Sequence, residues 1–103
     1  MAEFMKAIEA AKVPPDSMLT VRVGGESVLI ANVDGRYFAM GAACTHAGWD
    51  LSEGTLADTT ITCAGHGTAW DLKTGKGVFD EPLEDEPLYA VREQDGILYV
   101  MKR

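Results

Sequence analysis

Only four side chains in this sequence are soft metal ligands, and they form one repeated pattern. Cys44 and His46 are separated by one residue, and sixteen residues later Cys63 and His66 are separated by two. The sequence contains no other cysteine or histidine. Thiolate and imidazole together are typical ligands of zinc, copper and iron centres. The pattern therefore predicts a transition-metal site formed by two loops.

Each half of this pattern contains one thiolate and one imidazole. A zinc finger usually places two cysteines in one half and two histidines in the other, so that each pair binds the same ion. Mixed halves favour two metal positions instead, with the thiolates on one metal and the imidazoles on the other. This is Rieske ligation, in which two histidines replace two cysteines on one iron of a 2Fe-2S cluster.

The stretches around these residues resemble the two ligand loops of Rieske proteins. The first stretch reads CTHAGWDLSEG over residues 44–54, and the second reads CAGHGTAWDL over residues 63–72, followed by TGKG at 74–77. The resemblance is strong over residues 38–100 and weak before them. It implies one 2Fe-2S cluster per chain, with the inner iron bound by Cys44 and Cys63 and the outer iron by His46 and His66.

Further residues near the ligands have roles that the resemblance implies. Glycines let the backbone turn tightly and bring N–H groups to the sulfur atoms; those beside the ligands are Gly48, Gly65 and Gly67. A loop with Pro82 would cover the cluster and exclude water from one side.

Two positions indicate the reduction potential. Where high-potential Rieske proteins have a serine and a tyrosine that donate hydrogen bonds to the cluster, this chain has Thr68 and Trp70. Thr68 can still donate, whereas we expect Trp70 to be a core aromatic packed under the loop. The expected potential lies in the lower half of the Rieske range of about -150 to +300 mV.

Several alternatives stay open on the residues alone. The cysteines could be unrelated buried thiols and the histidines surface residues, although a disulfide is rare in a reducing compartment. A structural zinc module with two cysteines and two histidines is a stronger competitor. The small subunit of an assimilatory nitrite reductase resembles the same fold, but such subunits often lack the ligands.

Length and composition predict a single domain over residues 1–103. The chain is 47% apolar, which is ordinary for a globular protein, and it has neither an apolar run long enough for a membrane helix nor a secretory signal. We therefore expect a cytoplasmic protein that is not bound to a membrane.

The net charge of -7 disfavours nucleic-acid partners and favours a basic partner surface. Five acidic residues follow the second loop, and we interpret them as a solvated turn rather than a docking patch: Asp80, Glu81, Glu84, Asp85 and Glu86.

Short apolar segments between turn residues predict an all-β chain. The expected strands cover residues 18–23, 27–33, 36–42, 60–63, 68–72, 88–92 and 97–101, with hairpin turns at Gly24-Gly25, Asp34-Gly35 and Gln94-Asp95-Gly96. The segment 3–13 is ambiguous, because Phe4, Ile8 and Ala11 are spaced for a helix face. The resemblance favours an edge strand over residues 4–8, followed by a short turn that ends at Pro14-Pro15. The predicted fold is the Rieske fold, an antiparallel β-sandwich base (about residues 1–42 and 81–103) with an inserted cluster-binding subdomain of two ligand loops (about 43–80).

The resemblance implies a one-electron carrier that is not itself an enzyme. Its partners would be a flavin or iron–sulfur reductase and a terminal oxygenase or similar acceptor. An oxygenase needs a separate mononuclear iron bound by two histidines and a carboxylate, and no histidine is left for it. Trp49 and Leu51 are candidates for an apolar docking rim, although we expect Leu51 to lie in the core. We expect a monomer.

Overall fold

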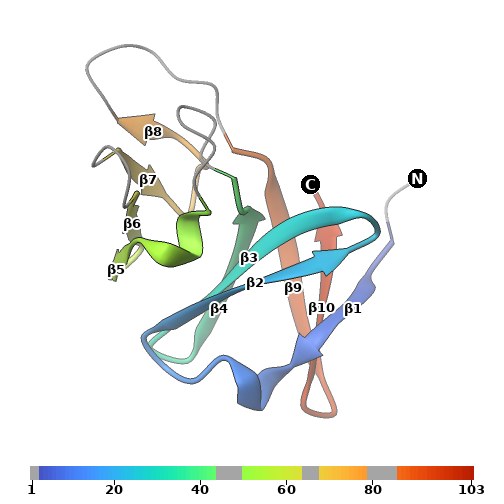
Figure 1. Cartoon of the computed structure of the whole chain (residues 1–103). Coiled ribbons are helices and arrows are strands. Elements are labelled where there is room, and N and C mark those ends of the chain that lie inside the picture. The colour runs from blue at the N-terminus through green and yellow to red at the C-terminus, as the bar shows by residue number, and fades with distance from the viewer. Residues whose placement is uncertain (1–2, 44–49, 64–67, 79–85) are drawn as a thin grey trace.

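The computed structural model describes residues 3–43, 50–63, 68–78 and 86–103. Its strands form two antiparallel sheets, which we call the base sheet and the small sheet (Figure 1). The base sheet has the order β1-β10-β9-β4-β3-β2, and the small sheet has the order β5-β6-β7-β8. The predicted all-β class is confirmed.

The base sheet contains the longer strands. Its members are β1 (Met5–Glu9), β2 (Ser17–Val23), β3 (Glu26–Val33), β4 (Arg36–Gly41), β9 (Leu88–Gln94) and β10 (Ile97–Lys102). The small sheet consists of β5 (Thr55–Ala57), β6 (Thr60–Thr62), β7 (Ala69–Asp71) and β8 (Gly77–Val78). Two short 3-10 helices complete the described elements: η1 (Ala10–Lys12) and η2 (Leu51–Glu53).

Three tight turns join the hairpins of the base sheet at the predicted places. Gly24 and Gly25 connect β2 to β3, and both have positive φ angles. Asp-Gly pairs connect β3 to β4 and β9 to β10, again with positive φ at both residues. Such turns match the right-handed twist of the strands that they join. Local turn chemistry therefore fixes the register of these hairpins.

The segment that the sequence left ambiguous is a strand. β1 pairs with β10 and lies at one edge of the base sheet, as expected from the resemblance, and its register shifts between Lys6 and Ile8. The chain then makes the turn η1 before β2. The edge strands β1 and β2 contact each other, so the base sheet curls around its own apolar interior.

Strand β3 has buried side chains on both of its faces. Val28 and Ile30 lie in the core inside the curled base sheet, whereas Leu29 and Ala31 lie in a second core between the two sheets. A continuous apolar run is typical of a strand that is buried on both sides. The run from Val28 to Ala31 thus links the two cores.

The small sheet lies between β4 and β9 in the sequence. These two strands pair with each other through Ala39 with Tyr89 and Met40 with Leu88. The chain therefore leaves the base sheet and returns to it at neighbouring points. The proposed limits of the cluster-binding subdomain, about 43–80, stay a prediction, because residues 44–49 and 79–85 lie outside the described part of the chain.

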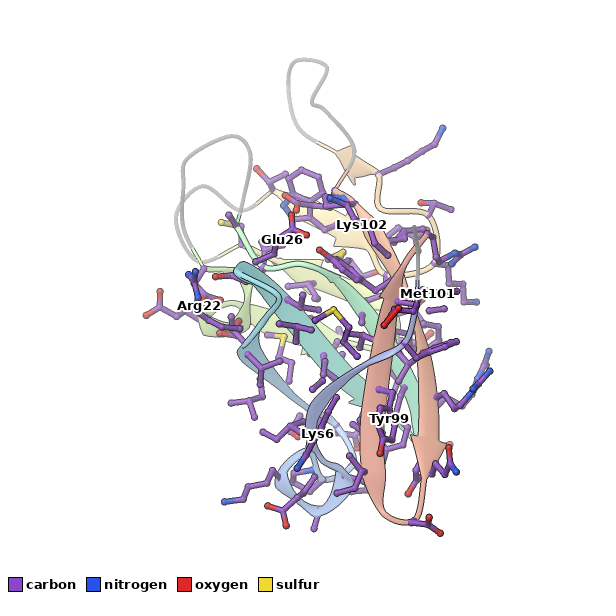
Figure 2. The ribbon with its side chains drawn as sticks, turned by 90° about the vertical axis from the view of Figure 1, so that its right-hand side faces the viewer. Lys6, Arg22, Glu26, Tyr99, Met101 and Lys102 are labelled. Atoms are coloured by element: carbon purple, nitrogen blue, oxygen red, sulfur yellow. The ribbon has the colours of Figure 1, made fainter. Side chains whose placement is uncertain are left out.

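A polar contact fixes the end of the β2–β3 hairpin to the C-terminal strands. Glu26 accepts hydrogen bonds from the hydroxyl of Tyr89 and from the ammonium group of Lys102, each at 3.3 Å. Figure 2 shows Glu26 and Lys102 close together. Burial and the neighbouring Glu26 carboxylate raise the pKa of Tyr89 above its usual value of 10.0.

Among the described residues, no helix is long and apolar enough to cross a membrane.

Candidate metal centre

The second ligand loop begins and ends on the small sheet. Strands β6 and β7 pair Thr62 with Ala69, and the backbone N–H of Cys63 donates to the carbonyl oxygen of Thr68 at 2.8 Å. This bond places Cys63 directly opposite Thr68 at the base of the loop. The side chain of Cys63 is buried in the core between the two sheets.

The other predicted ligands fall in the parts of the chain that the structure does not describe. The same holds for the predicted glycines and the proline near them. The residues outside the described ranges are Cys44, His46, His66, Gly48, Gly65, Gly67, Pro82 and the predicted rim residue Trp49. Their roles therefore stay predictions. The structure describes the residues at the two ends of each ligand loop, and we ask whether these residues fit a cluster.

Thr68 is fully buried, and its hydroxyl has no hydrogen-bond partner within the described part of the structure. A buried polar group without a partner costs about 1–3 kcal/mol, so an acceptor is expected beside it. Thr68 lies opposite Cys63, so a sulfur atom of a cluster bound at Cys63 would be such an acceptor. The residues at the base of the second loop thus fit a 2Fe-2S cluster.

Trp70 is fully buried in the core between the two sheets, as predicted. One edge of its ring lies against Gly77, where a Cβ atom would come within 2.7 Å of Cζ3 of the ring. Strand alternation puts Trp70 and Thr68 on the same face of the small sheet. The indole N–H also lacks a partner among the described residues. Trp70 is therefore a core residue of the small sheet, and its predicted place under the second loop stays a prediction.

The first ligand loop begins and ends at a short antiparallel contact. Ala43 forms a β-bridge with Asp50, and the N–H of Leu51 donates to the carbonyl of Ala42 at 2.7 Å. Leu51 is fully buried in the core between the sheets, as expected. These backbone contacts thus join the two ends of the six-residue segment 44–49, which includes Cys44 and His46.

Asp50 fixes this base through one carboxylate oxygen. Its Oδ1 accepts hydrogen bonds from the N–H of Ser52 at 2.9 Å, from the hydroxyl of Ser52 at 2.7 Å and from the hydroxyl of Thr20 at 2.7 Å. Burial alone would raise the pKa of Asp50, but the hydrogen bonds from Ser52 and Thr20 outweigh it and hold that pKa below the usual value.

Our reading of the sequence missed the role of Asp50. The available signal was the Asp-Leu-Ser sequence at residues 50–52, since an aspartate two residues before a serine often caps a turn. The bond to Thr20 spans thirty positions and had no local signal.

The interpretation of the acidic run as solvated is wrong for Glu86. Its side chain is only 4% exposed, and its N–H donates to the carbonyl of Gly75 at 2.7 Å. A Cβ atom at Gly41 would lie 2.6 Å from Oε1 of Glu86. Glu86 is buried because it lies where the chain returns to the base sheet. The other four acidic residues lie outside the described ranges.

Comparison with known proteins identifies the family of this chain. The profile of the Rieske [2Fe-2S] domain family matches residues 3–92. The biphenyl dioxygenase ferredoxin subunit of Pseudomonas sp. strain KKS102 is 38% identical over 90 residues, which covers 86% of this chain and 83% of the relative.

Two solved structures share the fold. A chain in the complex of reduced oxygenase and oxidized ferredoxin in carbazole 1,9a-dioxygenase is 30% identical, with a TM-score of 0.84 over 94% of this chain and 91% of that one. A ferredoxin of Sphingomonas yanoikuyae B1 is 25% identical, with a TM-score of 0.86 over 95% and 97% of the two chains. The cluster of this family is a Rieske 2Fe-2S centre. The family match over residues 3–92 and the 38% identity to the biphenyl dioxygenase ferredoxin subunit show that the chain belongs to the Rieske 2Fe-2S family.

Proposed function

We propose that this protein is a ferredoxin that carries single electrons from a flavin or iron–sulfur reductase to a terminal oxygenase. The observation that carries the proposal lies at the base of the second loop, where buried Cys63 pairs through its backbone with Thr68. The hydroxyl of Thr68 is buried and has no partner in the part of the chain that the structure describes. Similarity to the ferredoxin subunit of a biphenyl dioxygenase supports the choice of partner class. The carrier itself performs no bond chemistry.

Four residues would bind the cluster. Cys44 and Cys63 would hold the inner iron, and His46 and His66 the outer iron. When bound, the cluster supplies one reversible electron. The backbone bond between Cys63 and Thr68 fixes the main chain at the base of the second loop, and the side chain of Cys63 is buried in the core between the sheets.

Residues around this set would tune the potential. The hydroxyl of Thr68 would donate to a sulfur atom, which stabilises the more negative reduced state. The side chains of Trp70 and Leu51 are fully buried, and they would help to exclude water from the cluster. Gly48, Gly65 and Gly67 would let backbone N–H groups approach the sulfur atoms, and Pro82 would belong to a covering loop.

Charge and composition indicate how the partners are recognised. The net charge of -7 favours redox partners with basic surfaces and speeds encounter with them at low ionic strength. Trp49, beside the first ligands, would form part of an apolar contact rim. We further propose that the carrier is a cytoplasmic monomer.

The first test is the visible absorption of the purified protein, followed by EPR after reduction with dithionite. A red-brown protein with the rhombic signal of mixed histidine and cysteine ligation is the expected result. A colourless protein that holds one zinc ion would contradict the cluster and the electron-transfer function together. The Cys63→Ser variant is expected to be colourless, whereas Thr68→Ser keeps the cluster and serves as the matched control.

The second test measures electron delivery. The reduced protein is mixed with the oxygenase component of a biphenyl dioxygenase, and its reoxidation is followed by stopped flow. We expect reoxidation that slows as salt is added, because the attraction between charged surfaces is screened. A protein that holds the cluster but is reoxidised no faster than in air-saturated buffer alone would exclude this partner class.

A further inference from the structure

We propose that Asp50 is a positioning residue that holds the first ligand loop against the base sheet. The inference rests on the proposed ligand set, because Cys44 and His46 lie in the loop that Asp50 closes. It goes beyond the proposed function in assigning a role to a residue that binds neither iron nor partner.

The geometry gives Asp50 two separate attachments. Its β-bridge with Ala43 closes the loop, and its two bonds from Ser52 set the turn η2 that follows the loop. The bond from Thr20 reaches a different part of the molecule, since Thr20 lies in the middle of β2 in the base sheet. One carboxylate oxygen thus connects the exit of the loop to the edge of the base sheet.

The chemistry of this oxygen makes the attachment strong. Hydrogen bonds to an ionised acceptor are roughly twice as strong as those between neutral groups. The depressed pKa of Asp50 is consistent with a carboxylate stabilised in its charged form. Removing the side chain leaves three donors without their acceptor in a partly buried place, and the exit of the loop loses its connection to β2. The imidazole of His46, four residues earlier, would then be held less firmly.

The test measures how long the cluster survives in the holoprotein. Loss of visible absorption is followed under anaerobic conditions with an iron chelator, and EPR is recorded on the same samples. We expect Asp50→Ala to lose the cluster at least about tenfold faster than the wild type, because more than one charge-assisted bond is lost. Thr20→Val, which removes one donor, should accelerate the loss by a few-fold on the same basis.

Conservative variants separate positioning from charge. The neutral amide oxygen of Asp50→Asn has two lone pairs and can still accept hydrogen bonds at this place, but without the charge. Its cluster lifetime should therefore lie between those of the wild type and Asp50→Ala. Thr20→Ser keeps the hydroxyl, so its cluster lifetime should match that of the wild type. The matched control is Asp71→Ala, because Asp71 also caps a turn, through Lys73 N–H at 2.7 Å, but its described bonds stay within the small sheet.

Three outcomes would overturn the inference. Asp50→Ala could lose its cluster no faster than Asp71→Ala, Asp50→Asn could lose it as fast as Asp50→Ala, or Thr20→Val could match Thr20→Ser. If Asp50→Ala does not take up the cluster, the comparison of Thr20→Val with Thr20→Ser tests the inference. Failure of the proposed function would look different, because the wild-type protein would then either lack the cluster or hold it without delivering electrons.

Discussion

The two sheets of this protein are stabilised in different ways. Strands of the base sheet have five to eight residues, and the hairpins among them close with turns of positive φ. Strands of the small sheet have two or three residues, and the connection between β6 and β7 is a ligand loop instead of a tight turn. A ladder this short supplies few hydrogen bonds and little buried surface. We therefore expect the base sheet to fold by local rules, and the small sheet to depend on the shared core and on the bound cluster.

Removal of the cluster is the strongest way to test this contrast. We expect the Cys63→Ser variant, or the protein stripped of iron by acid and chelator, to lose amide protection throughout β5–β8 while β3 and β4 stay protected. Metal binding contributes directly to folding when the site is absent in the unfolded chain. Hydrogen exchange followed by mass spectrometry measures both regions in one sample. Equal loss of protection in both sheets would contradict the contrast.

A matched pair of isoleucines tests the contrast by packing. Ile30 lies in the core of the base sheet and Ile61 in the core between the sheets, and both side chains are fully buried. Substitution by alanine should destabilise the holoprotein by about 2–5 kcal/mol in either case. In the stripped protein, Ile30→Ala should keep this effect, whereas Ile61→Ala should lose most of it. Urea unfolding of both forms provides the measurement, and an equal effect in the stripped protein would refute the idea.

Thr68 offers a smaller effect within the small sheet. Replacing Thr68 by alanine removes the proposed donor to the cluster, so the reduced state loses more stabilisation than the oxidised state. A difference of about 1 kcal/mol corresponds to a decrease of about 40 mV in the potential. Protein-film voltammetry of Thr68→Ala measures this shift, with Thr68→Ser as the control that keeps the hydroxyl. A potential unchanged in Thr68→Ala would mean that the hydroxyl does not contact the cluster.

The smallest effect concerns pH and the base sheet. Because the pKa of Tyr89 is raised in the folded protein, its contribution to stability is complete below pH 10 and is lost as the pH rises through the folded-state value. We expect a decrease of less than about 1 kcal/mol, since the contact is partly open to solvent. Thermal unfolding of the stripped protein between pH 9 and pH 11 would show it, and Tyr89→Phe should remove this part of the pH dependence. If the wild type and Tyr89→Phe showed the same dependence of stability on pH, the effect would not come from Tyr89.

Much of the base sheet could be predicted from the sequence because its information is local. Gly24-Gly25 and the two Asp-Gly pairs mark their turns directly. The apolar segment over residues 27–33 predicted a strand, but it did not show that both faces of this strand would be buried or which cores they would meet. The burial of Trp70 and Leu51 also followed from their positions beside the ligand loops.

The rest of the site depends on contacts between residues far apart in the sequence. The bond from Thr20 to Asp50 forms only when β2 and the first loop are brought together. Glu86 is similar, because a run of acidic residues usually faces solvent, and only the return of the chain beside Gly41 and Gly75 buries this one. The ligand set was predicted from residue type and spacing, and Cys63 is the member whose burial the structure describes.

The pairing of β4 with β9 has a consequence for how this protein could be re-engineered. The chain departs after Gly41 and comes back at Pro87, and a hydrogen bond of 2.8 Å joins these two residues. The segment between them is therefore covalently joined to the base sheet at one place. A redox module from another protein could be transplanted at this place without cutting the scaffold elsewhere. The graft would have to bring its own apolar side chains to cover Leu29 and Ala31, which the native module shields from water.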